Sequence, residues 1–317
     1  MQSGMSKQII QKIFTGNNLG EVKSVEKMTV GFTNTVYSIN NTFILKVCEN
    51  EANEKNFAKE AFFYNFFKNI IPVPQVITYD DTKTLYNKNF IIYYKIIGDN
   101  LYTKWHVMTN AERKNVINQL CNILQKINDA DYREYAKNFH VSHTINWKNV
   151  ILSKIKKSLQ ELKTKNILTK DVIVEIQKFV QENAISLDEQ KIAFVYWDAH
   201  FDNILVKNNN IVGILDFERT ELASIDFGLD IFKRMMEQPQ KYMSEECEKF
   251  AKKEDYTHLL EWIEEFYPKM FAFKNLKQRL DLYSIEHDLH KLTQWPNAIE
   301  LKQQLAKTIR YSKKQTD

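Results

Sequence analysis

The clearest chemical pattern in the chain consists of two carboxylates and an amide in its second half. Asp198 follows an apolar run, Asn203 comes shortly after it, and Asp216 follows a second apolar run. Phosphoryl transfer from a nucleotide uses one acid to orient the attacking hydroxyl. An amide oxygen and a second acid hold the Mg²⁺ that neutralises the phosphates. The order and spacing of these three side chains therefore predict a kinase.

The segments around these side chains have the composition of short strands. Residues 192–195, 204–206 and 211–215 are apolar, and the last two flank an asparagine turn at 208–210. The pattern predicts strand, catalytic loop, strand, turn and strand, with the second acid at the end. Taken singly, the three polar side chains could also be a turn former, a strand cap and a loop acid.

A lysine and a glutamate upstream complete the set. Lys46 lies in an apolar segment, 42–47, that reads as a strand, and burial of its charge would require an acid or a phosphate. Glu60 lies beside the apolar stripe of a predicted helix, 54–68. A strand lysine paired with a helix glutamate is a device that holds nucleotide phosphates. The alternative for Lys46 alone is a solvent-facing strand position.

A hairpin precedes this strand. Gly31 lies between two extended runs within residues 28–39, and Asn40-Asn41 makes the next turn. Small polar residues at such a tip can present backbone N–H groups to phosphates. An ordinary hairpin turn is the alternative.

The apolar segment 91–97 is broken by Gly98, and its part from Tyr93 to Ile97 is the predicted linker between two lobes. Its backbone could contact a purine edge, which makes Tyr93, Tyr94 and Ile96 candidate nucleotide-binding residues. A plain edge strand would have the same composition.

The second part of the chain reads as mainly helical. A capping box at 109–112 begins one helix, residues 149–183 predict one or two more, and the chain after Asp216 predicts helices to its end. We therefore expect a nucleotide-binding lobe at 1–97 and a helical lobe with the catalytic loop at 98–317.

Composition narrows the functional classes. The 317 residues are 44% hydrophobic and 26% charged, as in an ordinary globular protein, with a net charge of only +4. Because lysines and acids are interspersed, the charge does not favour a nucleic-acid partner. No apolar stretch approaches the ~20 residues needed to cross a bilayer. The first residues lack the charged-then-apolar pattern of a secretion signal, so we expect none.

Three scattered cysteines, Cys48, Cys121 and Cys247, predict neither a disulfide framework nor a zinc site. We therefore expect a cytoplasmic protein without a nucleic-acid or membrane partner, as a monomer or weak dimer.

Three blocks of sequence resemble the aminoglycoside phosphotransferase and choline kinase family. Its catalytic block reads His-Gly-Asp, four residues, then Asn-Ile-Leu; residues 196–205 read Tyr-Trp-Asp, four residues, then Asn-Ile-Leu. Its metal block Ile-Asp-Phe-Glu is similar to Leu-Asp-Phe-Glu at 215–218, and its Asp-Pro-x-x-Asp-Leu to residues 226–231. The resemblance spans roughly residues 25–235. It implies an α+β, two-lobed protein-kinase-like fold, with a small antiparallel-sheet lobe and a larger, mainly helical lobe.

The resemblance implies a role for each candidate residue. Asp198 would position the acceptor hydroxyl and take its proton late, while Asn203 and Asp216 would coordinate Mg²⁺. Lys46 would hold the α- and β-phosphates of ATP or GTP, and Glu60 would orient Lys46.

The chain departs from the family pattern before the catalytic acid. Tyr196 and Trp197 replace histidine and glycine, and Trp197 must either pack into the lobe or line the acceptor site; we favour packing. His200 is interpreted as loop support rather than as a metal ligand.

The acceptor is the least determined part of the hypothesis. The leading acceptor is an aminoglycoside antibiotic, because a polycation would bind carboxylates of the second lobe. Candidate acceptor-binding residues are Trp197, Glu218, Asp226 and Glu286. A choline-type kinase is an alternative, since Trp197, Trp262 and Trp295 could form an aromatic cage. A sugar kinase and a catalytically inactive pseudokinase or binding protein are further alternatives.

Overall fold

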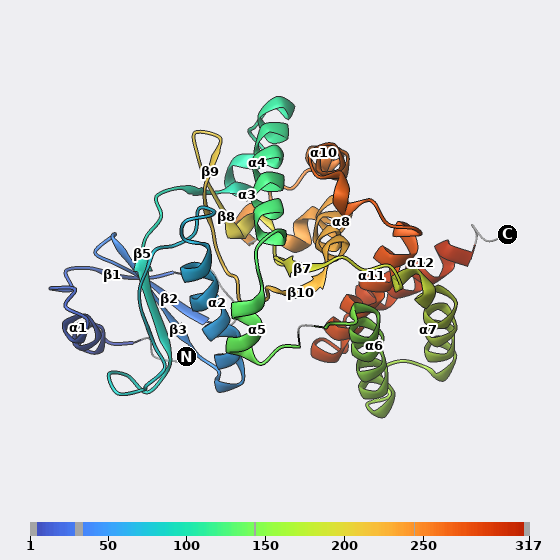
Figure 1. Cartoon of the computed structure of the whole chain (residues 1–317), viewed down its shortest axis with the longest axis horizontal. Coiled ribbons are helices and arrows are strands. Elements are labelled where there is room, and N and C mark those ends of the chain that lie inside the picture. The colour runs from blue at the N-terminus through green and yellow to red at the C-terminus, as the bar shows by residue number, and fades with distance from the viewer. Residues whose placement is uncertain (1–4, 29–33, 143, 244, 314–317) are drawn as a thin grey trace. The chain divides into compact units, whose positions relative to one another are not determined.

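The amino-terminal strands form one antiparallel sheet in the computed structural model, which describes residues 5–28, 34–142, 144–243 and 245–313 (Figure 1). The strand order is β1-β2-β3-β5-β4. Their bounds are β1 Val25–Met28, β2 Asn34–Ile39, β3 Phe43–Cys48, β4 Val76–Asp80 and β5 Phe90–Tyr94. The predicted strands in this part of the chain are confirmed, and β3 is flanked by a partner on each side.

The alternation of side chains along β3 assigns its two faces. Leu45 and Val47 belong to an apolar core with helix α1, Lys7–Gly16. Lys46, between them, points to the other face and meets helix α2, Glu54–Phe67. Figure 1 shows α1 and α2 on the two sides of this sheet. The period of two thus places one lysine opposite the apolar core.

Asparagine pairs form the tight turns of two hairpins. Asn40 and Asn41 have φ of +53° each, and Asn208 and Asn209 have φ of +51° and +60°. Asparagine tolerates this left-handed conformation better than most residues, and the twist of such turns fits a two-residue hairpin. Both predicted turns are confirmed.

The second turn joins strands of a small sheet with the order β6-β8-β9. The strands are β6 Asp99–Asn100, β8 Ile204–Lys207 and β9 Asn210–Ile214. A separate antiparallel pair joins β7, Ile192–Val195, to β10, Glu221–Ser224. The prediction of helix throughout the chain after Asp216 was wrong at β10, because this strand is too short to show a period and depends on pairing with β7.

The remaining chain is mainly helical, which confirms the predicted α+β class. The further helices are α3 Leu101–Trp105, α4 Asn110–Asn128, α5 Arg133–Phe139, α6 Trp147–Thr164, α7 Lys170–Asn183, α8 Leu229–Glu237, α9 Glu245–Glu248, α10 Leu259–Phe266, α11 Leu276–Gln294 and α12 Ile299–Lys313. The capping box is present at α4, where Glu112 Oε2 accepts from the Thr109 backbone N–H. Across the described ranges, no helix combines the length and apolar character required to cross a membrane.

The chain divides into two compact units. The first contains residues 1–126, 198–220 and 235–258, and the second contains 127–197, 221–234 and 259–317. The first unit therefore joins the amino-terminal sheet to the segment that carries the predicted catalytic and metal-binding side chains. The single lobe boundary predicted between 97 and 98 stays a prediction.

Candidate active site

A buried ion pair lies at the centre of the candidate site. Lys46 Nζ is 2.6 Å from Glu60 Oε2, and their side chains are 9% and 1% exposed. Glu60 Oε1 accepts a second hydrogen bond, of 2.7 Å, from Tyr64 Oη. Burial by itself lowers the pKa of Lys46, but the carboxylates of Asp216 and Glu60 outweigh it and raise that pKa well above its usual value. Lys46 is therefore held as an ammonium, turned away from solvent.

Asp216 contacts Lys46 of this ion pair through its side chain and Tyr64 through its backbone. Its Oδ1 lies 3.5 Å from Lys46 Nζ, and its backbone N–H donates to Tyr64 Oη at 2.9 Å. The Tyr64 hydroxyl thus bridges Glu60 and Asp216. Tyr64 was not predicted as a site residue. It could have been found from its position four residues after Glu60, a spacing that puts both side chains on one face of α2.

The backbone of Asp216 is in the left-handed region, with φ of +57°. This conformation costs a residue other than glycine roughly 1–2 kcal/mol, so the surroundings must hold it. Phe217 anchors the segment, since its ring lies 5.9 Å from that of Phe63 and 5.6 Å from that of Phe67. The packing of one aromatic side chain on α2 therefore positions the neighbouring carboxylate.

The predicted catalytic loop is closed by Asn203. Its Nδ2 donates to the Asp198 carbonyl oxygen at 3.0 Å and lies 3.2 Å from His200 Nε2. The Asn203 carbonyl oxygen in turn accepts from Leu215 N at 2.8 Å, next to Asp216. The side-chain nitrogen of Asn203 is engaged within the loop. Its side-chain oxygen, Oδ1, is the atom that a cation would bind. The structure thus joins the catalytic loop to the metal block by one backbone hydrogen bond.

Two further side chains support this loop. His200 Nε2 lies 3.6 Å from Asp198 Oδ1, a position that agrees with the predicted supporting role. Asn100 Nδ2 donates to the carbonyl oxygen and to Oδ1 of Asp202, at 3.0 and 2.9 Å. Asn100 was not predicted, because nothing in the sequence relates it to a loop so distant along the chain.

Glu218 lies with the metal block. Its side chain is buried and Oε2 accepts from Asn34 Nδ2 at 3.2 Å. Carboxylate oxygens of Glu60, Asp216 and Glu218 all lie within 4.8 Å of one another. Burial raises the pKa of Glu218, and the nearby Asp216 raises it further. The Glu218 carboxylate thus lies near the Lys46–Glu60 pair, and its predicted acceptor-binding role stays a prediction.

The structure describes three of the residues predicted to contact the nucleotide: Tyr93, Tyr94 and Ile96. Tyr93 is buried, and its ring lies 5.7 Å from that of Tyr64. The backbone N–H of Tyr94 donates to the Gln75 carbonyl oxygen, so this group is used within the sheet. Ile96 lies against Gly213, where an added Cβ would come within 2.8 Å of Ile96 Cδ1. Gly31 lies outside the described residues, and the purine contact stays a prediction.

Asp226, a predicted acceptor-binding residue, is a structural acid of the second unit. It is fully buried, and Arg279 Nε and Nη2 donate to its two oxygens at 2.7 and 2.8 Å. Ser224 Oγ and Tyr283 Oη donate as well, at 2.6 and 2.9 Å. Because the protein itself satisfies both carboxylate oxygens, these contacts do not support acceptor binding by Asp226, which stays a prediction.

Trp197 is half-buried and packs against aromatic neighbours of the second unit. Its ring is stacked on Phe227, with centroids 5.8 Å apart, and lies 5.4 Å from the ring of His287. This agrees with the favoured interpretation of packing, and its role toward an acceptor stays a prediction.

Glu286, another predicted acceptor-binding residue, lies among charged side chains of the second unit. Burial raises its pKa to about 7, Glu221 and Asp230 raise it too, and Lys154 and Arg234 oppose them. The side chain is nevertheless partly exposed. Glu221 is paired with Lys154 and Asp230 with Arg234, and the acceptor-binding role of Glu286 stays a prediction.

The raised pKa of Glu286 predicts a pH dependence of stability. Since the folded pKa of about 7 exceeds the ordinary 4.5, the folded state binds the proton more tightly. The stability from this group is fully present below pH 4.5 and is lost as the pH rises to about 7. Urea unfolding at pH 5 and pH 8 should therefore show a larger loss of stability in the wild type than in Glu286→Gln.

The control for this measurement is Glu182→Gln, which removes a carboxylate paired with Lys178 on an exposed helix face. It should reproduce the wild-type loss. If Glu286→Gln lost as much stability between pH 5 and pH 8 as the wild type, the raised pKa of Glu286 would be wrong.

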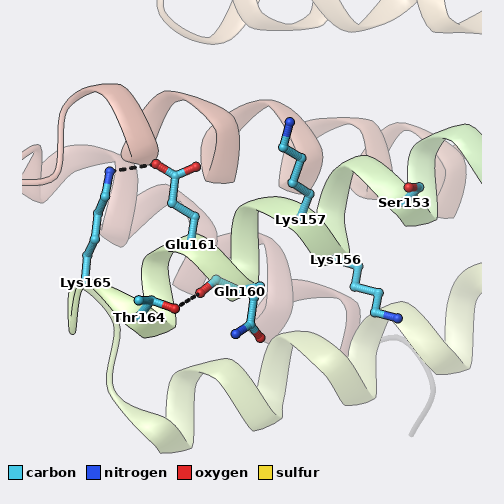
Figure 2. Close-up of a pocket in the computed structure, with 7 residues that line it drawn as sticks. All are labelled: Ser153, Lys156, Lys157, Gln160, Glu161, Thr164 and Lys165. Atoms are coloured by element: carbon cyan, nitrogen blue, oxygen red, sulfur yellow. Dashed lines mark hydrogen bonds and ion pairs between the residues drawn. The ribbon is translucent and has the colours of Figure 1, made fainter.

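A surface hollow on α6 contains none of the candidate residues. It is lined by Ser153, Lys156, Lys157, Gln160, Glu161, Thr164 and Lys165 (Figure 2). Figure 2 shows Lys165 paired with Glu161, at 2.7 Å. The lining side chains come from one helix and its end, without an acid or amide beyond those of a solvated helix face, so we assign no chemistry to it.

Comparison with known proteins agrees with the geometry. A model described as the phosphotransferase enzyme family matches residues 24–229. Solved structures similar to the chain include aminoglycoside phosphotransferase APH(2'')-Ib with bound ADP (TM-score 0.70, 16% identity, 96% of this chain and 97% of that one covered). A streptomycin–ATP complex of APH(2'')-IIa has a TM-score of 0.70 and 17% identity, with 97% and 99% covered. A GDP complex of aminoglycoside 2'-phosphotransferase-IIIa has a TM-score of 0.71 and 14% identity, with 96% and 98% covered. At such identities the likeness establishes the fold, and the predicted kinase-like fold is confirmed.

Proposed function

The chain belongs to the phosphotransferase enzyme family, and we propose that it moves the γ-phosphate of ATP or GTP to a hydroxyl of a small molecule. The observation that carries this proposal is the buried Lys46–Glu60 pair with Asp216 beside it. A buried ammonium between two carboxylates is costly to maintain for stability alone. Beside the loop that carries Asp198, the arrangement has the parts that phosphoryl transfer requires.

The residues present fit a magnesium ion. Mg²⁺ binds oxygen ligands, and Asp216 offers a carboxylate whose oxygen lies within 4.8 Å of those of two further acids. Asn203 would provide its amide oxygen. When bound, Mg²⁺ would neutralise charge on the nucleotide phosphates.

The chain's own residues would divide the remaining tasks. Lys46 would hold the α- and β-phosphates, and Glu60 keeps the ammonium in place. The acceptor oxygen would form a bond to the γ-phosphorus as the bond to the nucleoside diphosphate breaks. Asp198 would orient that hydroxyl and accept its proton late in the transfer.

We propose a cationic, hydroxylated acceptor, with an aminoglycoside as the leading candidate. Glu286 is a partly exposed acid of the second unit, and similar structures contain streptomycin, gentamicin or kanamycin. Choline-type compounds and sugars are the alternatives of the same class. A protein that binds nucleotide without turnover is the alternative of another class.

A panel screen tests the proposal. Nucleotide consumption should be measured with ATP and GTP, in the presence of Mg²⁺, against aminoglycosides, choline, ethanolamine and sugars. We expect acceptor-dependent formation of nucleoside diphosphate and of a phosphorylated acceptor, identified by mass spectrometry. Nucleotide binding without turnover on any acceptor of the panel would favour the pseudokinase alternative.

A second prediction concerns the phosphate contact of Lys46. Lys46→Met alone would leave Glu60 buried and unpaired, so the variant of choice is the double change Lys46→Met/Glu60→Met, which leaves no buried charge from the pair. ATP with Mg²⁺ should raise the melting temperature of the wild type. It should leave the melting temperature of the double variant unchanged. Scanning fluorimetry of both proteins, with and without nucleotide, measures this.

The matched control is Lys83→Met, which breaks a pair with Glu54 at the surface. It should keep the full nucleotide-dependent rise. If the double variant kept it as well, the phosphate role of Lys46 would be wrong.

A further inference from the structure

Tyr64 is buried where the lysine–glutamate pair meets Asp216. The residue is 1% exposed, and its ring lies edge-on to those of Tyr93 and Phe217, with centroids 5.7 and 5.9 Å apart. Packing against these two rings sets where the phenol hydroxyl lies. The hydroxyl itself is shared between a carboxylate and a backbone N–H, at 2.7 and 2.9 Å.

The hydrogen bonds of this hydroxyl have a fixed direction. The Asp216 backbone N–H can only donate, so the Tyr64 oxygen accepts from it. The single hydroxyl proton is then left for Glu60 Oε1. Burial and the nearby Glu60 carboxylate raise the pKa of Tyr64 well above its usual value, so the hydroxyl keeps this proton. The hydroxyl therefore connects the backbone of Asp216 to the carboxylate that holds Lys46.

Asp216 depends on this contact more than a residue of an ordinary loop would. Its backbone is in the left-handed region, which a residue other than glycine adopts only where its surroundings hold it. Phe217 anchors the next position on α2, and the Tyr64 hydroxyl is the partner of the Asp216 N–H itself. Loss of that partner would favour rotation of the peptide group. The Asp216 carboxylate would then leave its place 3.5 Å from Lys46 Nζ.

We propose that Tyr64 is a positioning residue for phosphoryl transfer, whose hydroxyl holds the Lys46–Glu60 pair and Asp216 in one fixed arrangement. This role rests on the proposed function, in which Lys46 contacts the nucleotide phosphates and Asp216 the Mg²⁺ bound to them. A displacement of about 1 Å in such a group is enough to lower a rate by about 100-fold. Because Tyr64 acts through these groups, its hydroxyl should affect the use of Mg²⁺ and the rate of transfer, and not the affinity for the acceptor.

Tyr64→Phe tests this role in the full chain, because it removes the hydroxyl and keeps the ring. The first readout is the Mg²⁺ concentration that gives half of the rise in melting temperature with a non-hydrolysable ATP analogue, measured by scanning fluorimetry. Tyr64→Phe should raise this concentration by about tenfold, as loss of an outer contact of a metal ligand does. With the best acceptor of the panel, kcat should fall by about 10- to 100-fold while the KM of the acceptor stays unchanged.

The matched control is Tyr37→Phe, which also removes one buried hydroxyl from the amino-terminal sheet. Tyr37 is 4% exposed, and its hydroxyl accepts a hydrogen bond of 2.8 Å from the Met5 backbone N–H. Its ring belongs to the apolar core shared with α1, on the face of the sheet opposite Lys46. This variant should keep the wild-type Mg²⁺ requirement and kcat.

A double variant tests whether the hydroxyl acts through Glu60. The loss of kcat in Tyr64→Phe/Glu60→Gln should be smaller than the product of the two single losses, since both changes break the same contact. A wild-type Mg²⁺ requirement in Tyr64→Phe, with or without a loss of kcat, would overturn the positioning role and leave the proposed function intact. Independent losses in the double variant would overturn it as well. A wild type that neither responds to the analogue with Mg²⁺ nor phosphorylates an acceptor would overturn the proposed function and the role of Tyr64 together.

Discussion

Replacing Asp198 with alanine is expected to lower kcat for the best acceptor by about 10²- to 10⁴-fold, the usual contribution of a positioned general base. The side chain is 19% exposed and lies on a loop that Asn203 closes through the Asp198 carbonyl oxygen. Since that bond uses the backbone, the substitution should leave the loop closed. Nucleoside diphosphate formation at saturating acceptor measures kcat, and scanning fluorimetry should show an unchanged nucleotide-dependent rise in melting temperature.

The control for the catalytic variant is Asp131→Ala, which removes an exposed acid paired with Arg133. It should retain wild-type kcat. An Asp198→Ala enzyme with wild-type turnover would show that another group orients the acceptor.

Replacing Arg279 with methionine is expected to lower the free energy of unfolding by about 3–5 kcal/mol, because the change leaves the Asp226 charge buried without its partner. Arg279 is fully buried, and besides Asp226 it donates to the carbonyl oxygens of Ser186 and Glu189, at 2.6 and 2.7 Å. One side chain therefore joins α11 to two separate segments of the second unit. Urea unfolding, monitored by circular dichroism, measures the loss.

The contrast with an exposed pair makes the stability measurement specific. Arg133→Met breaks the pair with Asp131 at the surface, where water solvates both charges, and it should leave the unfolding midpoint close to that of the wild type. A double variant Arg279→Met/Asp226→Leu should recover part of the loss, since it removes the stranded charge. Equal midpoints for Arg279→Met and the wild type would contradict the structural role.

Local patterns in the sequence were sufficient for the elements that carry the site. Residues 42–47 form a short, largely apolar run, the helix that carries Glu60 has a helical apolar stripe, and asparagine pairs mark both turns. Each of these signals depends on backbone geometry over a few neighbouring residues, so it can be recognised without knowledge of the fold. The same reasoning failed for β10, whose four residues extend because β7 lies beside them.

The sequence by itself determined which side chains could transfer phosphate, while the tertiary structure decided which acids remain available to do it. Asp226 and Glu218 both come after Asp216 as acids beside apolar residues, yet Arg279 neutralises the first, and the second lies with Lys46 and Asn34. Their partners are distant along the chain, and the chain holds 40 acids and 44 basic residues that could pair in many ways. Packing selects among these pairings, because the cost of burying a charge depends on the groups that surround it.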